Sequence, residues 1–478
     1  MTENIRLADL SAPPDNPGQL LAVTHELFVS WFGGKYDLQA LGVVLAAAAA
    51  ERLGGDPPWV MVVSGSGAAK TESIMPLGGA GAVVVSTITG EGALLSGTAK
   101  KERAADANGG LLRKVGSRGL LVVKDVTSIL AMQRDARAAV LAALREIYDG
   151  RWERHVGTDG GRVLSWEGRL VLIGAVTSAW DSAYSVIAAM GDRFVLVRID
   201  STENRRAAGL QALRNVDHEP RMRDELAKAV GALIDSVDPA AVPEMAEDEM
   251  FAVLDLADVV TRARTAVERD YAGNVVCAHA PEMPTRFAKQ LAQLARGGMA
   301  LGMDRVDALA LAVRCAGDSL PPLRLSILGD VATHPMTRTY EVGKRLQIPR
   351  KTADRVLQEL HLLGLLSIEE EPRGESVRWL YSLDESVSAR VVRVLTTRRV
   401  ARIVTPPCRG ARNMTTIRPK TPVVGIEETA CHRCGVTVRY VPTEDGPGRA
   451  TCGRCCRPRQ ACARIERPEA DRLDAVGL

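Results

Sequence analysis

The chain has 478 residues, of which 46% are hydrophobic and 25% are charged, and its formal net charge is +3. These values exclude disorder over the whole length, and at about 100–200 residues per domain they suggest roughly three domains. The most apolar run, 38–50, is too short to span a bilayer and ends at Glu51 and Arg52. Because the first residues lack the basic and apolar parts of a secretory signal, we expect a cytoplasmic protein without membrane contact.

Short apolar runs alternate with helical patterns over residues 38–203, which predicts an α/β domain around a parallel sheet. Most runs are continuously apolar, as is typical of strands buried on both faces. The expected strands are 59–63, 82–86, 119–123, 169–176 and 194–199. The turn sequence at 158–161 further predicts an inserted β-hairpin made of 151–156 and 162–166.

A phosphate-binding loop is predicted directly after the strand at 59–63. Such a loop needs small residues whose N–H groups surround phosphates, a lysine for the β- and γ-phosphates, and a hydroxyl for Mg²⁺. Lys70 and Thr71 fit the last two roles, whereas Ser64 and Ala69 replace the usual first and last glycines. A small-residue turn is the alternative, but the position between strand and helix favours ATP binding. The loop comprises Gly65, Ser66, Gly67, Ala68, Ala69, Lys70 and Thr71.

Three further positions at strand ends are candidates for nucleotide chemistry. Asp125 follows the strand at 119–123, and its carboxylate could hold Mg²⁺ or orient the attacking water. Thr177 follows the strand at 169–176 and could orient water near the γ-phosphate. Arg193 precedes the strand at 194–199 and could stabilise charge in the transition state. Taken singly, each also fits an ordinary strand end or a solvated surface residue.

The order and spacing of these motifs resemble AAA+ ATPases and, among them, the minichromosome-maintenance helicases. The resemblance covers roughly residues 38–315 and rests on Gly67-Ala68-Ala69-Lys70-Thr71, Thr89-Gly90-Glu91-Gly92-Ala93, Arg193-Phe194 and Pro284-Thr285-Arg286-Phe287. It implies ATP and Mg²⁺ as cofactors, a helical lid with Arg286 as a second sensor, and a hairpin that touches DNA. It also implies that Arg193 acts on a neighbour's nucleotide in a homo-oligomeric ring of six.

Two departures from that family concern hydrolysis. Lys124 stands where those helicases have an aspartate and Asp125 where they have the following glutamate, while Thr177 replaces an asparagine. These changes bear on the rate of hydrolysis, and even on its occurrence, more than on ATP binding.

A second DNA-binding candidate is predicted at 323–383, where three helical patterns (323–332, 339–346 and 350–363) precede a hairpin. This order resembles a winged helix-turn-helix domain. The third helix would enter the major groove with its polar face, and Arg373 on the wing would contact phosphate. A winged helix that contacts protein is the alternative, but the basic first turn favours DNA. The groove-facing residues are Arg350, Lys351, Thr352 and Arg355.

In the C-terminal region, composition and cysteine spacing predict a basic linker followed by a zinc ribbon. Residues 386–425 contain nine Arg or Lys residues and no acid, which fits either phosphate contact or a solvated tether. Two Cys-x-x-Cys pairs, separated by seventeen residues, have the spacing of a four-thiolate structural Zn²⁺ site. The ligands are Cys431, Cys434, Cys452 and Cys455, and Cys456 could replace Cys455.

Together these features predict an ATP-dependent DNA motor or remodeller, a ring helicase or replication-initiation ATPase of a phage or mobile element. Its partners would be DNA, further copies of itself and replication proteins. The alternative is a DNA-binding transcriptional regulator whose AAA+ domain is nucleotide-gated and hydrolyses ATP weakly or not at all. The expected domains are an N-terminal segment (1–37), an AAA+ core (38–203), a helical lid (204–320), a winged helix (321–385), a basic linker (386–425) and a zinc ribbon with its tail (426–478).

Overall fold

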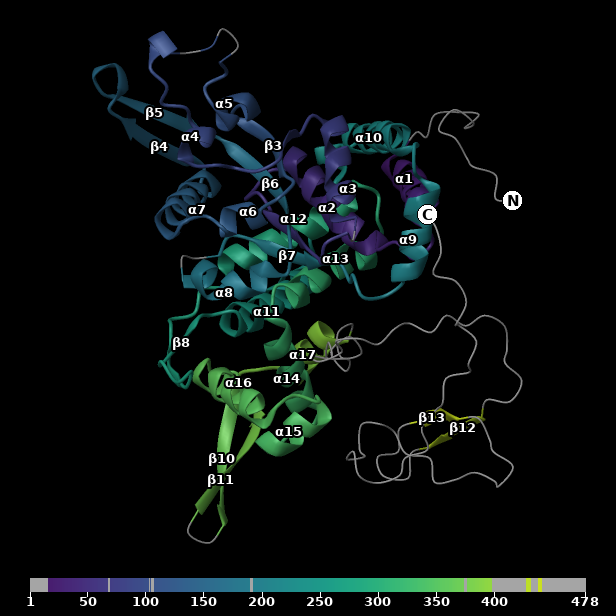
Figure 1. Ribbon diagram of the computed structural model, residues 1–478, viewed down its shortest axis with the longest axis vertical. Helices are drawn as coiled ribbons and strands as arrows, with labels where there is room; N and C mark the ends of the chain where they lie inside the picture. Colours follow the sequence, from purple (N-terminus) through teal and green to yellow (C-terminus); the bar gives the residue numbers. More distant parts are fainter. Residues whose placement is uncertain are drawn as a thin grey trace, which may run out of the picture. The chain divides into compact units, whose positions relative to one another are not determined.

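The structure, a computed structural model, describes residues 16–397 apart from 68, 103, 105–106, 190–191 and 374–375, together with 427–430 and 437–440. The chain divides into two compact units, Met1–Pro406 and Pro407–Leu478. In the second unit, β12 (Glu427–Ala430) pairs antiparallel with β13 (Thr437–Tyr440). All other elements belong to the first unit (Figure 1). No helix in the described ranges is both long and apolar enough to cross a bilayer.

A parallel sheet of five strands forms the centre of the first unit, in the order β2-β3-β6-β1-β7. Val62 of β1 lies opposite Ala175 of β6 on one side and Val197 of β7 on the other. The strands are almost continuously apolar because helices cover both faces, which confirms the expected α/β class. Their bounds are β1 (Val60–Val63), β2 (Val83–Val85), β3 (Arg118–Val123), β6 (Arg169–Val176) and β7 (Val195–Arg198).

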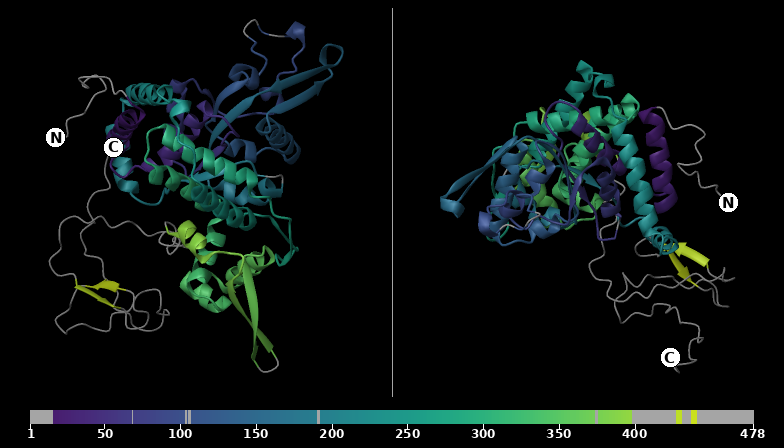
Figure 2. Two further views of the ribbon diagram at one scale, coloured as in Figure 1. Left: turned by 180° about the vertical axis from the view of Figure 1, so that it is seen from behind. Right: turned by 90° about the horizontal axis from the view of Figure 1, so that it is seen from above.

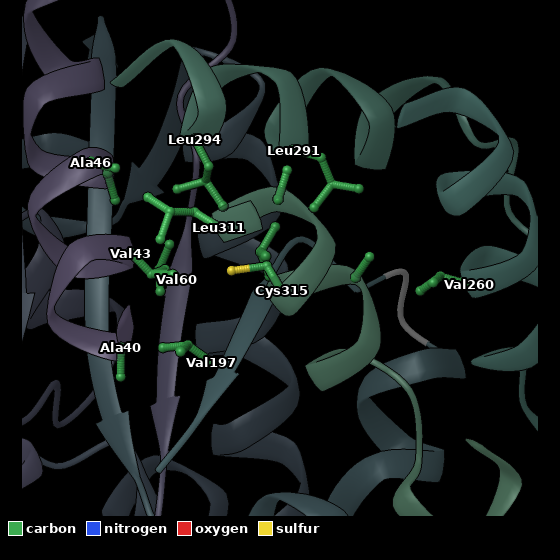
Figure 3. Close-up of a cluster of buried hydrophobic side chains, with 14 of the residues drawn as sticks. Ala40, Val43, Ala46, Val60, Val197, Val260, Leu291, Leu294, Leu311 and Cys315 are labelled. Carbon is green, nitrogen blue, oxygen red and sulfur yellow. The ribbon is translucent and has the colours of Figure 1, made fainter. Parts of the chain in front are cut away.

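Helices from distant parts of the sequence cover one face of this sheet. α2 (Leu38–Arg52), α12 (Thr285–Ala300) and α13 (Arg305–Asp318) meet around the buried side chains drawn in Figure 3. α7 (Arg134–Tyr148) and α8 (Ala179–Ala189) contribute to the core on the other face. Short helices in the connections are α3 (Lys70–Ile74), η2 (Met75–Ala80), α4 (Glu91–Leu94), η3 (Lys100–Glu102), α5 (Leu111–Val115) and α6 (Thr127–Leu130).

The region after the sheet is mainly helical, as expected for 204–320. It contains α9 (Arg205–Arg214), α10 (Glu219–Asp235) and α11 (Glu247–Ala263), besides α12 and α13, with the short turn η5 (Pro239–Ala241). A small antiparallel hairpin, β8 (Val267–Arg269) and β9 (Val275–Ala278), interrupts this region and was not expected from the sequence.

The first 37 residues, expected to be a mixed segment, contain α1 (Pro17–Phe32). Asn16 caps this helix by accepting the Gln19 N–H at 2.9 Å, and Pro17 lies in its first turn. The right view of Figure 2 shows α1 alongside α10, and Phe28 is fully buried in the core they share. Residues 16–37 are therefore part of the folded unit.

Two hairpins lie where the sequence predicts them. β4 (Arg151–Val156) pairs with β5 (Arg162–Glu167) through a turn that contains η4 (Thr158–Gly160). Further along, α14 (Pro322–Thr333), α15 (Thr339–Arg345) and α16 (Arg350–Leu362) precede the hairpin of β10 (Leu366–Arg373) and β11 (Ser376–Leu383) (Figure 1). Thr337 adds a single bridge to Tyr381 at the edge of that hairpin.

The first part of the expected basic linker contains a helix, α17 (Ala389–Thr396). Val392 and Leu395 bury one face of this helix against α14 and α13. Apolar residues three apart give the segment a helical face that its basic composition obscures. The linker prediction is therefore wrong for this stretch, and residues 398–426 lie outside the described residues.

The contact between α2 and α12 depends on a glycine. A Cβ atom at Gly297 would lie 2.0 Å from the carbonyl oxygen of Ala46, so the two backbones could not keep their present distance.

We expect Gly297→Ala to destabilise the protein by about 1–3 kcal/mol, because overpacking against backbone cannot be relieved by a side-chain rotation. The matched control is Gly209→Ala in α9, where a Cβ would meet nothing within 4 Å and where alanine raises helix propensity. Urea titration followed by circular dichroism measures both changes. Equal stability of the two variants would contradict the close-packing argument.

Candidate functional site

The predicted phosphate loop, Asp125 and Thr177 lie at one edge of the sheet. They follow β1, β3 and β6 respectively, and the carboxyl ends of parallel strands share an edge. Because β6 lies between β1 and β3, Thr177 is placed between the loop and Asp125. Ligands of open α/β sheets bind outside such an edge, so the geometry favours a nucleotide here.

The loop turns sharply into α3. Ala69 caps this helix with a positive φ of 55°, and Ala68 lies outside the described residues. Nζ of Lys70 donates to the carbonyl oxygen of Gly65 at 3.0 Å, so the ammonium group lies over the loop. Burial lowers the pKa of Lys70, and the negative charge of Asp125 opposes that shift. Lys70 and Asp125 therefore interact electrostatically at this edge.

A cleft of about 1750 Å³ opens beside the loop. Residues 33–37, which connect α1 to α2, line it together with the segment after β7 and parts of α9, α13 and α17. A nucleotide base and ribose could lie against these segments while the phosphates reach the loop. The cleft residues that come from the loop are Gly65, Ser66, Gly67, Ala69, Lys70 and Thr71.

An ion pair in this cleft was missed by sequence reasoning. Arg314 of α13 donates to both carboxylate oxygens of Asp37 at 2.6 Å, and it also donates to the carbonyl oxygen of Arg198 at 2.9 Å. Asp37 in turn caps α2 by accepting the Ala40 N–H. The sequence did show an arginine within the apolar pattern of α13, which could have indicated a buried ion pair. Its partner Asp37 is 277 residues away in the sequence, so the pair could not be predicted from local residues.

Asp125 and Thr177 are linked through Thr127. The Asp125 carboxylate accepts the Thr127 N–H at 3.0 Å, and the Thr127 hydroxyl accepts the Thr177 N–H at 3.2 Å. Asp125 is exposed to solvent, whereas Thr177 is half-buried. The hydroxyl of Thr71 and the carboxylate of Asp125 are hard oxygen donors, and Mg²⁺ is usually held by such donors together with substrate phosphates. The donor set therefore fits Mg²⁺.

Arg193 and Arg286 lie at the opposite edge of the sheet from the loop. Arg193 precedes the amino end of β7, where it pairs with Asp149 at 3.4 Å and lies over the ring of Tyr148. Arg286, in the first turn of α12, pairs with Glu282 at 3.1 Å. The two arginines are joined to one another through α12, because Gln290 donates to the carbonyl oxygen of Arg193 at 2.8 Å. Neither residue lines the cleft of its own chain.

Arginines of the β4–β5 hairpin bond to other parts of the same chain. Arg154 donates to the carbonyl oxygen of Leu95 at 2.7 Å, and Arg162 donates to that of Thr98 at 2.9 Å. The exposed arginine Arg151 pairs with Glu153 at 2.6 Å. These contacts fix the hairpin to the chain, and the expected contact of the hairpin with DNA stays a prediction.

The predicted groove-facing residues of α16 fall into two groups, those exposed to solvent and one that bonds within the protein. Arg350 and Lys351 are exposed in the first turn, and Thr352 is half-exposed beside them. Arg355 instead donates to the carbonyl oxygen of Ala272, in the turn between β8 and β9, at 2.8 Å. Its guanidinium thus holds α16 against that turn.

The hairpin beyond α16 is acidic. Glu369 and Glu370 of β10 are exposed, and Glu371 pairs with Arg338 and with Arg378 at 3.3 and 3.2 Å. The side chain of Arg373, the predicted phosphate contact, lies outside the described residues. Carboxylates repel phosphates, so the described part of this hairpin gives no support to phosphate contact.

The predicted zinc ligands Cys431, Cys434, Cys452 and Cys455 also lie outside the described residues, as does Cys456. Among the residues that are described, no group of three or more His, Cys, Asp or Glu side chains could hold a metal ion. The zinc site remains a prediction from the spacing of the cysteines.

Comparisons with known proteins leave the family open. No family model matches the sequence, and no curated protein matches it either. Among solved structures, the chain is similar to a full-length MCM homologue from Methanopyrus kandleri, with 12% identity and a TM-score of 0.36. The match covers 65% of this chain and 63% of that chain, so it spans less than two thirds of the homologue.

We expect Gly65→Ala to weaken ATP binding about tenfold, because the new Cβ would lie 2.4 Å from the Ser201 hydroxyl and 3.1 Å from the Ser201 Cβ, and rotation of the hydroxyl does not relieve the second contact. Binding of a fluorescent ATP analogue measures the effect. The double variant Gly65→Ala/Ser201→Gly removes the clash and should recover most of the affinity, with Ser201→Gly alone as the control. A double variant no better than Gly65→Ala would contradict this steric explanation.

Proposed function

We propose that this protein is an AAA+ ATPase that acts on DNA as a ring-forming helicase or replication-initiation ATPase of a phage or mobile element. One observation carries the proposal. The strand order β2-β3-β6-β1-β7 brings the phosphate loop, Asp125 and Thr177 to one edge of the sheet beside a large cleft. Residue types suited to phosphates, Mg²⁺ and water thus meet where α/β sheets bind ligands.

Each residue at this edge has a proposed role with ATP. Backbone N–H groups of the loop and Nζ of Lys70 hold the β- and γ-phosphates, and Lys70 exchanges its bond to Gly65 for the phosphate. Thr71 and Asp125 hold Mg²⁺, which neutralises charge on the phosphates when it is bound. Thr177, tied to Asp125 through Thr127, orients water near the γ-phosphate.

The proposed active site is completed by a second copy of the chain. Arg193 and Arg286 lie at the sheet edge opposite their own phosphate loop, so they cannot reach the nucleotide of their own chain without a rearrangement of the sheet. In a head-to-tail arrangement, the arginines of one copy meet the cleft of the next, and such contacts close into a ring. We propose a ring of six.

DNA is the proposed partner of the winged-helix domain made by α14, α15, α16 and the β10–β11 hairpin. The exposed first turn of α16, with Arg350, Lys351 and Thr352, supports contact with a duplex. The basic segment after α17 would add affinity that does not depend on DNA sequence. The cysteine pairs beyond it would bind Zn²⁺ in a structural site.

A transcriptional regulator with a nucleotide-gated AAA+ domain is the second candidate. Lys124 favours it, because a lysine replaces the acid that normally precedes Asp125 and leaves the site with less negative charge for Mg²⁺. Such a protein would bind ATP and change its affinity for DNA without turnover.

ATP hydrolysis by the purified protein separates these two candidates. We expect turnover that single-stranded or forked DNA stimulates, and we expect Lys70→Ala and Arg193→Ala each to reduce it at least about 100-fold. Lys228→Ala is the control, since Lys228 is an exposed lysine that pairs only with Asp224 of its own helix among the described contacts. ATP binding that alters DNA affinity without turnover would reject the motor and support the regulator.

Binding to a labelled duplex over a range of salt concentrations tests the winged helix. We expect Arg350→Ala/Lys351→Ala to weaken binding and to lower the slope of log K against log salt by about two, because two phosphate contacts are lost. Arg355→Ala should leave that slope unchanged, since its guanidinium is bonded to Ala272. An unchanged slope in the double variant would indicate a winged helix that contacts protein.

A further inference from the structure

A buried network connects the loop that carries Arg193 to the helix that carries Arg286. Arg264, which follows the last residue of α11, lies at its centre with a side chain only 4% exposed. Its Nη2 donates to Oε2 of Glu282 at 2.9 Å, and its Nη1 lies 3.9 Å from Oδ2 of Asp192. One guanidinium thus contacts two carboxylates that belong to different segments.

One of these carboxylates is next to Arg193 in the chain, and the other pairs with Arg286. Asp192 precedes Arg193 directly, and its Oδ1 accepts the Phe194 N–H at 2.8 Å, which fixes the backbone on both sides of Arg193. The other oxygen of Glu282, Oε1, lies 3.1 Å from Nη2 of Arg286.

Contacts with neighbouring groups keep the Arg264 guanidinium in place. Its Nη1 also donates to the carbonyl oxygen of Phe194 at 3.4 Å, and its Cζ lies 4.4 Å from the centre of the Phe287 ring. Phe287 follows Arg286 and is fully buried. Arg264 therefore contacts the residues next to both Arg193 and Arg286, but neither arginine itself.

We propose that Arg264 is a positioning residue that sets Arg193 and Arg286 at a fixed spacing, so that both reach the nucleotide of a neighbouring copy together. The inference rests on the proposed composite active site. A planar guanidinium can donate to one carboxylate and to a carbonyl in fixed directions while it faces a second carboxylate, as Arg264 does with Glu282, Phe194 and Asp192, whereas an ammonium group cannot keep that geometry. A buried ion-pair network of this kind contributes little net stability. We therefore assign its role to the fixed geometry that it imposes on its partners.

The test compares Arg264→Lys and Arg264→Met with the unsubstituted protein. The phosphate loop lies at the opposite sheet edge, so ATP affinity and KM should stay within about twofold. We expect kcat to fall about 10- to 100-fold in both variants, because a small displacement of positioned groups is enough to lose that rate. Arg262→Met is the matched control: Arg262 lies two residues earlier, and its partners Asp258, Gly364 and Ser386 all lie outside the network.

Mixing of subunits distinguishes positioning from loss of structure. Arg264→Met protein keeps an intact phosphate loop, and Lys70→Ala protein keeps intact arginines, so a mixture of the two should turn over ATP faster than either variant alone. Recovery in the mixture with unchanged ATP affinity supports the proposal.

Three outcomes would overturn the proposal. One is wild-type kcat in both Arg264 variants, and another is loss of ATP binding in both, which would indicate a structural role. The third is a mixture that is no more active than its components. Absence of turnover in the unsubstituted protein would reject the proposed function, and this inference with it.

Discussion

The parallel order of the five-stranded sheet is the constraint on which the remaining features depend. Insertion of β6 between β1 and β3 brings Thr177 between the predicted phosphate loop and Asp125, which requires these three strands to be neighbours in this order. That order is maintained by burial on both faces, where α2, α12 and α13 cover one side and α7 the other. Close approach at Gly297 shows how little space this packing leaves. The positions of the candidate site residues are thus set by the core.

The chemistry of the first unit is distributed over two edges of that sheet. Groups suited to phosphates and Mg²⁺ lie at the carboxyl edge, while Arg193 and Arg286 lie at the amino edge and are connected through Arg264, Glu282 and Gln290. On the proposed function, a single copy holds two half-sites and no complete one. ATP turnover would then report assembly as well as chemistry, which is why complementation between variants is informative.

Arginines in this protein are used extensively for internal contacts. Arg355 joins α16 to the β8–β9 turn, Arg154 holds the β4–β5 hairpin, and Arg314 connects α13 to the start of α2. Because these arginines are bonded within the protein, net charge and local basic runs overestimate the positive charge that could contact DNA. Of the groove-facing residues predicted on α16, only Arg350 and Lys351 in its first turn are fully exposed. In the adjoining hairpin, the negatively charged Glu369 and Glu370 are exposed.

The sequence by itself determined the five strands, the β4–β5 hairpin, the helices that precede β10 and β11, and the loop between β1 and α3. Apolar periodicity and turn residues are local signals, so each element could be predicted from its own residues. Only the tertiary structure decided that Arg314 pairs with Asp37, that Arg355 bonds to Ala272, and that Arg264 joins Asp192 to Glu282. These contacts link segments 18 to 277 residues apart, and charge alone does not specify which partner each arginine meets once the helices have packed.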